Sequence, residues 1–191
     1  MASAITHALI GGAFGLLAVA VSKPLATSTG ELESEVRRDA DLRLRRRLPW
    51  LLAVLSAAPD LDVLMHAFVR YSHTFGHRGA FHSLGFYLLV ALACARATPL
   101  VERRLFVGFS AFVTLLSHSL LDMLTNGGLG IGLFWPLSSE RLFFPWRPIP
   151  VSPLTVSSFF SSWGVRVLSV ELWFAVPVFA GAWWFQRTRR H

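Results

Sequence analysis

The sequence predicts an all-α fold, a polytopic membrane helical bundle with about five transmembrane helices and one interfacial amphipathic helix. Of the 191 residues, 53% are hydrophobic and only 15% are charged, and the apolar residues gather in long runs. Soluble domains carry about a quarter charged residues. A chain with 16 Phe and 7 Trp does not stay disordered, and the single Cys94 excludes a disulfide scaffold. The length fits one domain, residues 1–191.

Five apolar stretches approach the length of about 20 residues that a membrane-spanning helix needs. They are expected at about 4–22, from 48 to an interruption at Pro59, at 82–97, at 105–125 and at 165–186.

Two further segments differ in character. Residues 31–47 contain acid-first i,i+4 pairs, Glu33 with Arg37, Asp39 with Arg43 and Asp41 with Arg45, beside a thin apolar stripe. This pattern predicts a cytoplasmic surface helix that lies against anionic lipid, although a solvated charged linker has a similar pattern. Residues 127–164 are rich in Gly, Pro and aromatic residues and predict an interfacial loop.

The positive charges are distributed unevenly between the two sides of the predicted bundle. Thirteen of the 18 Lys and Arg fall on one side, which the positive-inside rule places in the cytoplasm. We therefore expect a multi-pass protein of the inner (plasma) membrane, with an outside N-terminus and a cytoplasmic C-terminus. No basic stretch is interleaved with base-stacking aromatics, which argues against nucleic-acid binding. The thirteen residues are Lys23, Arg37, Arg38, Arg43, Arg45, Arg46, Arg47, Arg96, Arg103, Arg104, Arg187, Arg189 and Arg190.

Ionisable side chains within membrane spans are costly and tend to mark function. In this topology, four segments bring such residues to the extracytoplasmic level. Pro59 and Gly79 allow turns that aim side chains inward. Imidazole and carboxylate groups are ligands for zinc and similar ions, so these residues predict a site for one or two divalent ions. The candidate ligands are His7, Asp60, Asp62, His77, His82, His118 and Asp122.

Each of these residues alone also has an ordinary structural explanation, such as a helix cap or a contact between helices. It is their shared level that favours a metal site. His66 and His73 are reserve ligands for which solvated interfacial positions are the better interpretation. Glu171, inside the last span, is either a helix-packing partner or a group that supports the site.

Several motifs resemble the YdjM-like family, described as inner-membrane-associated metal-dependent hydrolases, some of them LexA-regulated. The motifs are THALIGG (6–12), PDLD (59–62), HRGAFHS (77–83), SHSLLDMLTNGG (117–128) and FWPLSSERLF (134–143). The resemblance implies a distant relation to zinc-dependent phospholipases C and single-strand nucleases, with the seven candidate ligands at the matching positions. Those relatives also use an HxxxE motif and the terminal amine. This chain has no HxxxE and Met1 lies six residues before His7, so one or two ions are expected rather than three.

The chemistry expected from these residues is hydrolysis by metal-activated water, with Asp60 or Asp62 as the base. Arg78, together with Arg70 or Arg147, is a candidate to bind a phosphate. The depth of the site and the resemblance favour a membrane lipid or a lipid-linked phosphoester as substrate. The alternatives are a divalent-ion or proton transporter, a serine hydrolase using Ser83 or Ser117, and a non-catalytic protein stabilised by metal.

Overall fold

Helices account for all the regular secondary structure in the computed structural model, which describes residues 2–25, 31–153 and 156–189. Two isolated bridges, Thr125 with Ile149 and Ile131 with Leu142, tie the long loop after α4 together. The predicted all-α class is confirmed. The elements are α1 (Ala4–Val21), α2 (Glu31–Ala57), η1 (Ala58–Ala67), η2 (Ala80–His82), α3 (Leu84–Ala97), η3 (Val101–Arg103), α4 (Arg104–Met123), α5 (Val156–Phe159) and α6 (Ser162–Thr188).

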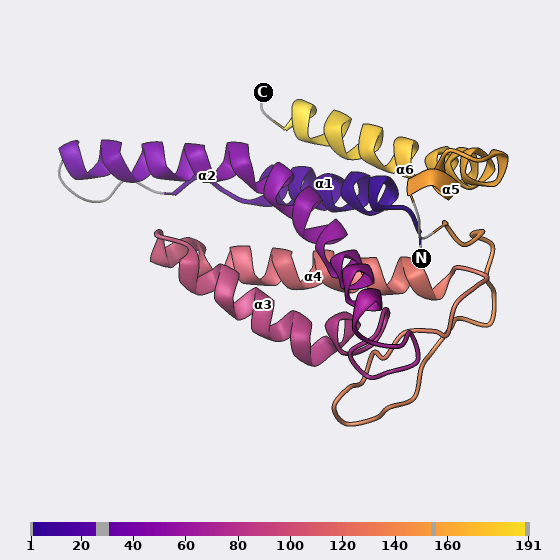
Figure 1. Cartoon of the computed structure of the whole chain (residues 1–191). Helices are drawn as coiled ribbons and strands as arrows, with labels where there is room; N and C mark the ends of the chain where they lie inside the picture. The colour runs from indigo at the N-terminus through magenta and orange to yellow at the C-terminus, as the bar shows by residue number, and fades with distance from the viewer. Residues whose placement is uncertain (1, 26–30, 154–155, 190–191) are drawn as a thin grey trace.

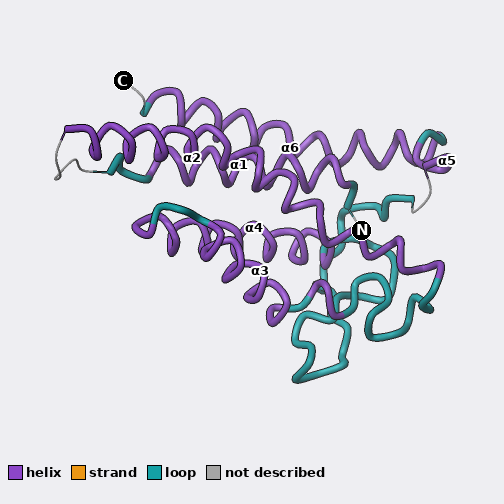
Figure 2. The backbone as a smooth tube through the Cα atoms, turned by 60° about the vertical axis from the view of Figure 1, so that its left-hand side comes forward, coloured by secondary structure: helices purple, strands orange, loops and turns teal. Residues whose placement is uncertain are grey.

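Helix α1 occupies the middle of the bundle, with α2 and α6 against it and the α3–α4 pair beneath (Figures 1 and 2). Serine caps fix where three of the helices begin. The side chains of Ser3, Ser83 and Ser161 accept hydrogen bonds from the backbone N–H groups of Thr6, Phe86 and Gly164.

The bundle has the dimensions and the surface of a membrane protein. Four helices, Ala4–Val21, Leu32–Met65, Val101–Met123 and Ser162–Thr188, are long and apolar enough to cross a membrane, and α3 is apolar but shorter at 14 residues. Large apolar side chains face outward, among them Leu105 at 87% exposure and Trp173 at 84%. Exposed apolar surface on this scale marks contact with lipid or a partner.

The predicted boundary between a surface helix at 31–47 and a span from 48 is wrong. Helix α2 runs without a break from Glu31 to Ala57, through Pro49. Although the composition changes from charged to apolar near residue 47, no residue there ends the helix, because membrane helices tolerate an internal proline such as Pro49. The loop predicted at 127–164 likewise gives way to helix at Val156 and again at Ser162. Arg190, counted in the basic tail, lies outside the described residues.

Two of the three predicted pairs within α2 are present and one is wrong. Arg37 binds Glu33 at 3.1 Å, and Arg43 lies 3.9 Å from Asp39. Asp41 instead accepts two bonds from Arg103, at 2.7 and 3.1 Å. A bidentate partner from another element outcompetes the local one because Asp41 is buried against that element.

Helix α1 approaches α2 closely at Gly15. A Cβ atom added there would overlap the backbone Cα of Pro49, whereas one added at Gly181 in α6 would meet nothing within 4 Å. We expect Gly15→Ala to destabilise the protein by about 1–3 kcal/mol, the usual cost of overpacking. The control Gly181→Ala should be neutral or stabilising by up to about 1 kcal/mol. Unfolding in mixed micelles measures both, and equal effects would contradict the packing described.

Candidate metal centre

The structure brings the seven candidate ligands together at one end of the bundle. They come from the start of α1, from η1, from the turn before α3 and from the last turns of α4. All seven are buried. Their proximity is a finding of the structure, while their role as ligands stays a prediction.

The centre of the group consists of His7, Asp60, His118 and Asp122. Each offers one ligand atom, and these four atoms lie within 4.8 Å of one another. His7 Nε2 is 3.3 Å from Asp122 Oδ1 and 3.9 Å from Asp60 Oδ2, and His118 Nε2 is 3.6 Å from Asp60 Oδ1. Zinc ligands lie about 2.0–2.2 Å from the ion, so small shifts would let the four atoms surround one cation.

Asp60 gives the clearest indication that a cation binds between these side chains. Its side chain is 6% exposed, and no donor among the described residues hydrogen-bonds to either carboxylate oxygen. A buried carboxylate without donors is costly unless it is paired or coordinates a metal. The donor set of imidazole nitrogens and carboxylate oxygens fits zinc or a similar divalent ion.

His118 is held so that its Nε2 faces this centre. Its Nδ1 lies 2.7 Å from the backbone carbonyl of Ser56, which can only accept, so Nδ1 is protonated and donates. The Nε2 of neutral His118 therefore presents a lone pair. Orientation of a ligating imidazole through its other nitrogen is usual at metal sites. The ring also stacks on that of His7, with centroids 3.8 Å apart.

His82 supplies a fifth possible ligand atom beside the centre, a third imidazole nitrogen. Its Nε2 lies 3.0 Å from His118 Nε2, a distance at which two lone pairs would repel unless a proton or a cation lies between them. Burial lowers the pKa of His82, but the close approach and the charges of Asp60 and Asp62 raise it to about 9. Because a histidine must be neutral to ligate a metal, the raised pKa opposes metal binding at this nitrogen.

Asp62 lies behind these ligands and connects them. Its Oδ1 is 2.5 Å from His77 Nδ1, and its Oδ2 is 3.1 Å from His82 Nδ1. Oδ2 also accepts the backbone N–H of Arg78 at 3.1 Å. The carboxylate is thus occupied on both oxygens by groups that it orients.

Arg78 is fully buried, and most of its donors are used within the protein. Nε donates to Asp122 Oδ2 at 3.0 Å, and the terminal nitrogens donate to Gly127 O and Thr125 Oγ1, both at 2.8 Å. Its backbone has a positive φ of 65°, so the strained position of this turn is Arg78 rather than Gly79. These contacts hold Asp122 in place, and phosphate binding by Arg78 stays a prediction.

The start of α1 is anchored by the carboxylates of Glu171 and Asp122. The buried carboxylate of Glu171, on α6, accepts the backbone N–H of Ser3 and the hydroxyl of Thr6, both at 2.9 Å, as well as the hydroxyl of Ser3. The backbone N–H of Ala2 donates to Asp122 Oδ1 at 2.6 Å. Glu171 is therefore a helix-packing partner that joins α6 to α1, and its support of the site stays a prediction.

Of the two reserve histidines, His73 does not join the cluster. The side chain of His73 is exposed, and its Nδ1 accepts the backbone N–H of Phe75. The side chain of His66 lies outside the described residues. The sequence could not predict that the backbone carbonyl of Ser56 orients His118, because any residue type provides a carbonyl. The serine caps of the helices, in contrast, can be recognised from the residue type.

Comparison with known proteins agrees with the motifs. A model of the YdjM inner membrane protein family matches residues 1–190. The inner membrane protein YbcI of Escherichia coli (strain K12) is 40% identical over 151 residues, which cover 74% of this chain and 85% of that protein. No solved structure matches. The chain therefore belongs to the YdjM inner membrane protein family.

Proposed function

We propose that this chain is a multi-pass inner-membrane hydrolase that uses one or two divalent ions, zinc by preference, to cleave a phosphoester of a lipid or lipid-linked molecule. The observation that carries the proposal is Asp60, a buried carboxylate without hydrogen-bond donors that lies within 3.9 Å of the Nε2 atoms of His7, His82 and His118. The family name and the apolar helices support the membrane location.

The residues that would hold the ion are His7, Asp60, His118 and Asp122, with His82 beside them. When bound, a divalent ion lowers the pKa of water and polarises the scissile group. Asp60 is our candidate for the carboxylate that takes the proton from the attacking water, because neither of its oxygens is committed to a donor.

The surrounding residues position these groups. Asp62 orients His77 and His82, and Arg78 with the Ala2 N–H orients Asp122. The contacts of Asp62 favour this positioning role over that of the base. Of the candidates for phosphate binding, Arg70 and Arg147 are exposed and Arg78 is buried and engaged, so Arg70 and Arg147 are better placed to meet a substrate from outside.

A metal-loading assay on the full chain tests the proposal. We expect zinc-loaded protein in detergent to hydrolyse a phosphatidic acid or p-nitrophenyl phosphate substrate, and chelated protein and His118→Ala to lose the activity. His73→Ala is the control, because this histidine is exposed and outside the cluster. Absence of hydrolysis across both substrates, or zinc flux into liposomes instead, would contradict a hydrolase and favour the transport alternative.

A further inference from the structure

Two adjoining hollows open between α1, α2 and α6, and none of the seven candidate metal ligands lines either of them. One, of about 740 Å³, follows α1 from Ile5 to Leu16, and the other, of about 540 Å³, lies beyond it near Ser22. Both are lined by Arg45, Arg46 and Gln186, so they meet at these residues. We call the two hollows together the α1–α2–α6 groove.

The larger part of the groove is apolar. Leu9 and Leu16 of α1 line one wall, Trp50 lines the α2 side, and Phe179 and Trp183 line the α6 side. From Ile5 to Leu16 the groove follows twelve residues of helix, a rise of roughly 16 Å at 1.5 Å per step. Trp50 is 77% exposed and Trp183 45% exposed at the edges, so the groove opens toward the surface that faces lipid.

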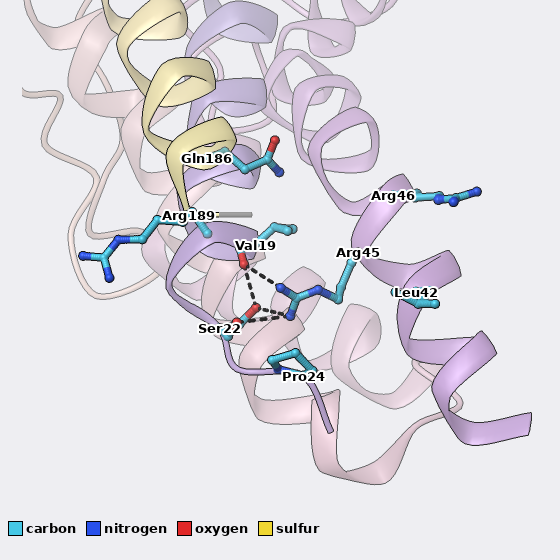
Figure 3. A pocket seen from close by; sticks show the side chains of 9 residues that line it. Val19, Ser22, Pro24, Leu42, Arg45, Arg46, Gln186 and Arg189 are labelled. Atoms are coloured by element: carbon cyan, nitrogen blue, oxygen red, sulfur yellow. Dashed lines mark hydrogen bonds between the residues drawn. The ribbon is translucent and has the colours of Figure 1, made fainter. Parts of the chain in front are cut away.

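The other end of the groove is basic. Arg45 crosses the hollow from α2 and donates to Val19 O at 3.0 Å and to Ser22 Oγ at 2.8 Å, while Arg46 and Arg189 extend outward on opposite sides of it (Figure 3). No carboxylate of the described residues forms an ion pair with Arg46 or Arg189. The mouth thus presents positive charge that the described residues do not neutralise.

We propose that the α1–α2–α6 groove binds one anionic phospholipid of the surrounding leaflet, with an acyl chain along Leu9, Trp50 and Phe179 and the phosphate at Arg46 and Arg189. We choose an anionic phospholipid because its phosphate is complementary in charge to Arg46 and Arg189, and each basic residue near an anionic lipid surface contributes to binding. An elongated apolar wall that ends in arginines matches the division of a phospholipid into tail and headgroup. The proposed phosphate position, near Ser22, lies at the end of α1 opposite to His7 of the metal centre.

Native mass spectrometry of the full chain in mild detergent tests this site, with phosphatidylglycerol and phosphatidylcholine as probes. We expect phosphatidylglycerol to be retained in preference to phosphatidylcholine, and Arg46→Gln and Arg189→Gln each to weaken its retention about fivefold. Arg47→Gln is the matched control, since Arg47 is exposed but lines neither hollow.

A second pair of variants tests the apolar part. Ala53→Phe places a ring in the groove, whereas Val54→Phe changes the neighbouring exposed position outside it. Loss of the retained lipid in Ala53→Phe but not in Val54→Phe would support the proposal. Equal retention of both lipids, equal effects within either pair of variants, displacement by inorganic phosphate alone, or a second copy of the chain in place of the lipid would overturn it.

Discussion

Asp122→Ala should destabilise the protein by about 3–5 kcal/mol, the cost of leaving a buried charge without its partner. Asp122 and Arg78 are both fully buried, and Arg78 Nε donates to Asp122 Oδ2 at 3.0 Å. Asp122 also accepts the Ala2 N–H, so its loss affects α1 as well as the loop at residues 125–127. Reversible unfolding in mixed micelles, in metal-free buffer, measures the change.

A matched control for this prediction is Asp39→Ala. The Asp39 side chain is 70% exposed and pairs with Arg43 at 3.9 Å. An exposed pair of this kind contributes less than about 1 kcal/mol. Similar losses for the two variants would contradict the view that Asp122 and Arg78 form a buried pair on which the site depends.

His118→Ala should lower the affinity for zinc by about 100-fold or more. Loss of a group that merely orients a ligand costs 10–100-fold, and His118 presents its own Nε2 to the centre because the Ser56 carbonyl fixes Nδ1. Competition with a fluorescent zinc chelator, on purified full-length protein, gives the two dissociation constants.

The control for zinc affinity is His73→Ala, which removes an exposed imidazole outside the cluster and should leave the affinity unchanged. If His118→Ala binds zinc as the parent does, the four-residue centre is not the metal site. A parallel loss in His73→Ala would indicate adventitious binding to surface histidines.

The grouping of the site was open to prediction because ionisable side chains stand out within apolar spans. The alternating direction of the predicted spans placed His7, Asp60, His82 and His118 at one predicted level of the membrane, and the charge asymmetry assigned that level to the outer side. The hydrogen-bond partners of each of these residues, and hence their separate roles, could not be predicted. Asp62 and Asp60 are two residues apart and chemically identical, and only tertiary contacts show that Asp62 is engaged by His77 while Asp60 is not.

Contacts between distant segments also explain why two predictions about the fold are wrong. Local i,i+4 spacing suggested Asp41 with Arg45, but Arg103, 62 residues away, provides the bidentate partner. Arg45 instead binds the carbonyl end of α1. Helix α2 continues through Pro49, whose backbone packs closely against Gly15 of α1, and the sequence pattern of one segment cannot reveal this contact.

The measurement that tests the central claim most directly is anomalous scattering at the zinc edge from crystals of the full, metal-loaded chain. We predict a peak about 2.0–2.2 Å from ligand atoms of His7, Asp60, His118 and Asp122. No peak at this position, with zinc absent or bound elsewhere on the protein, would contradict the account.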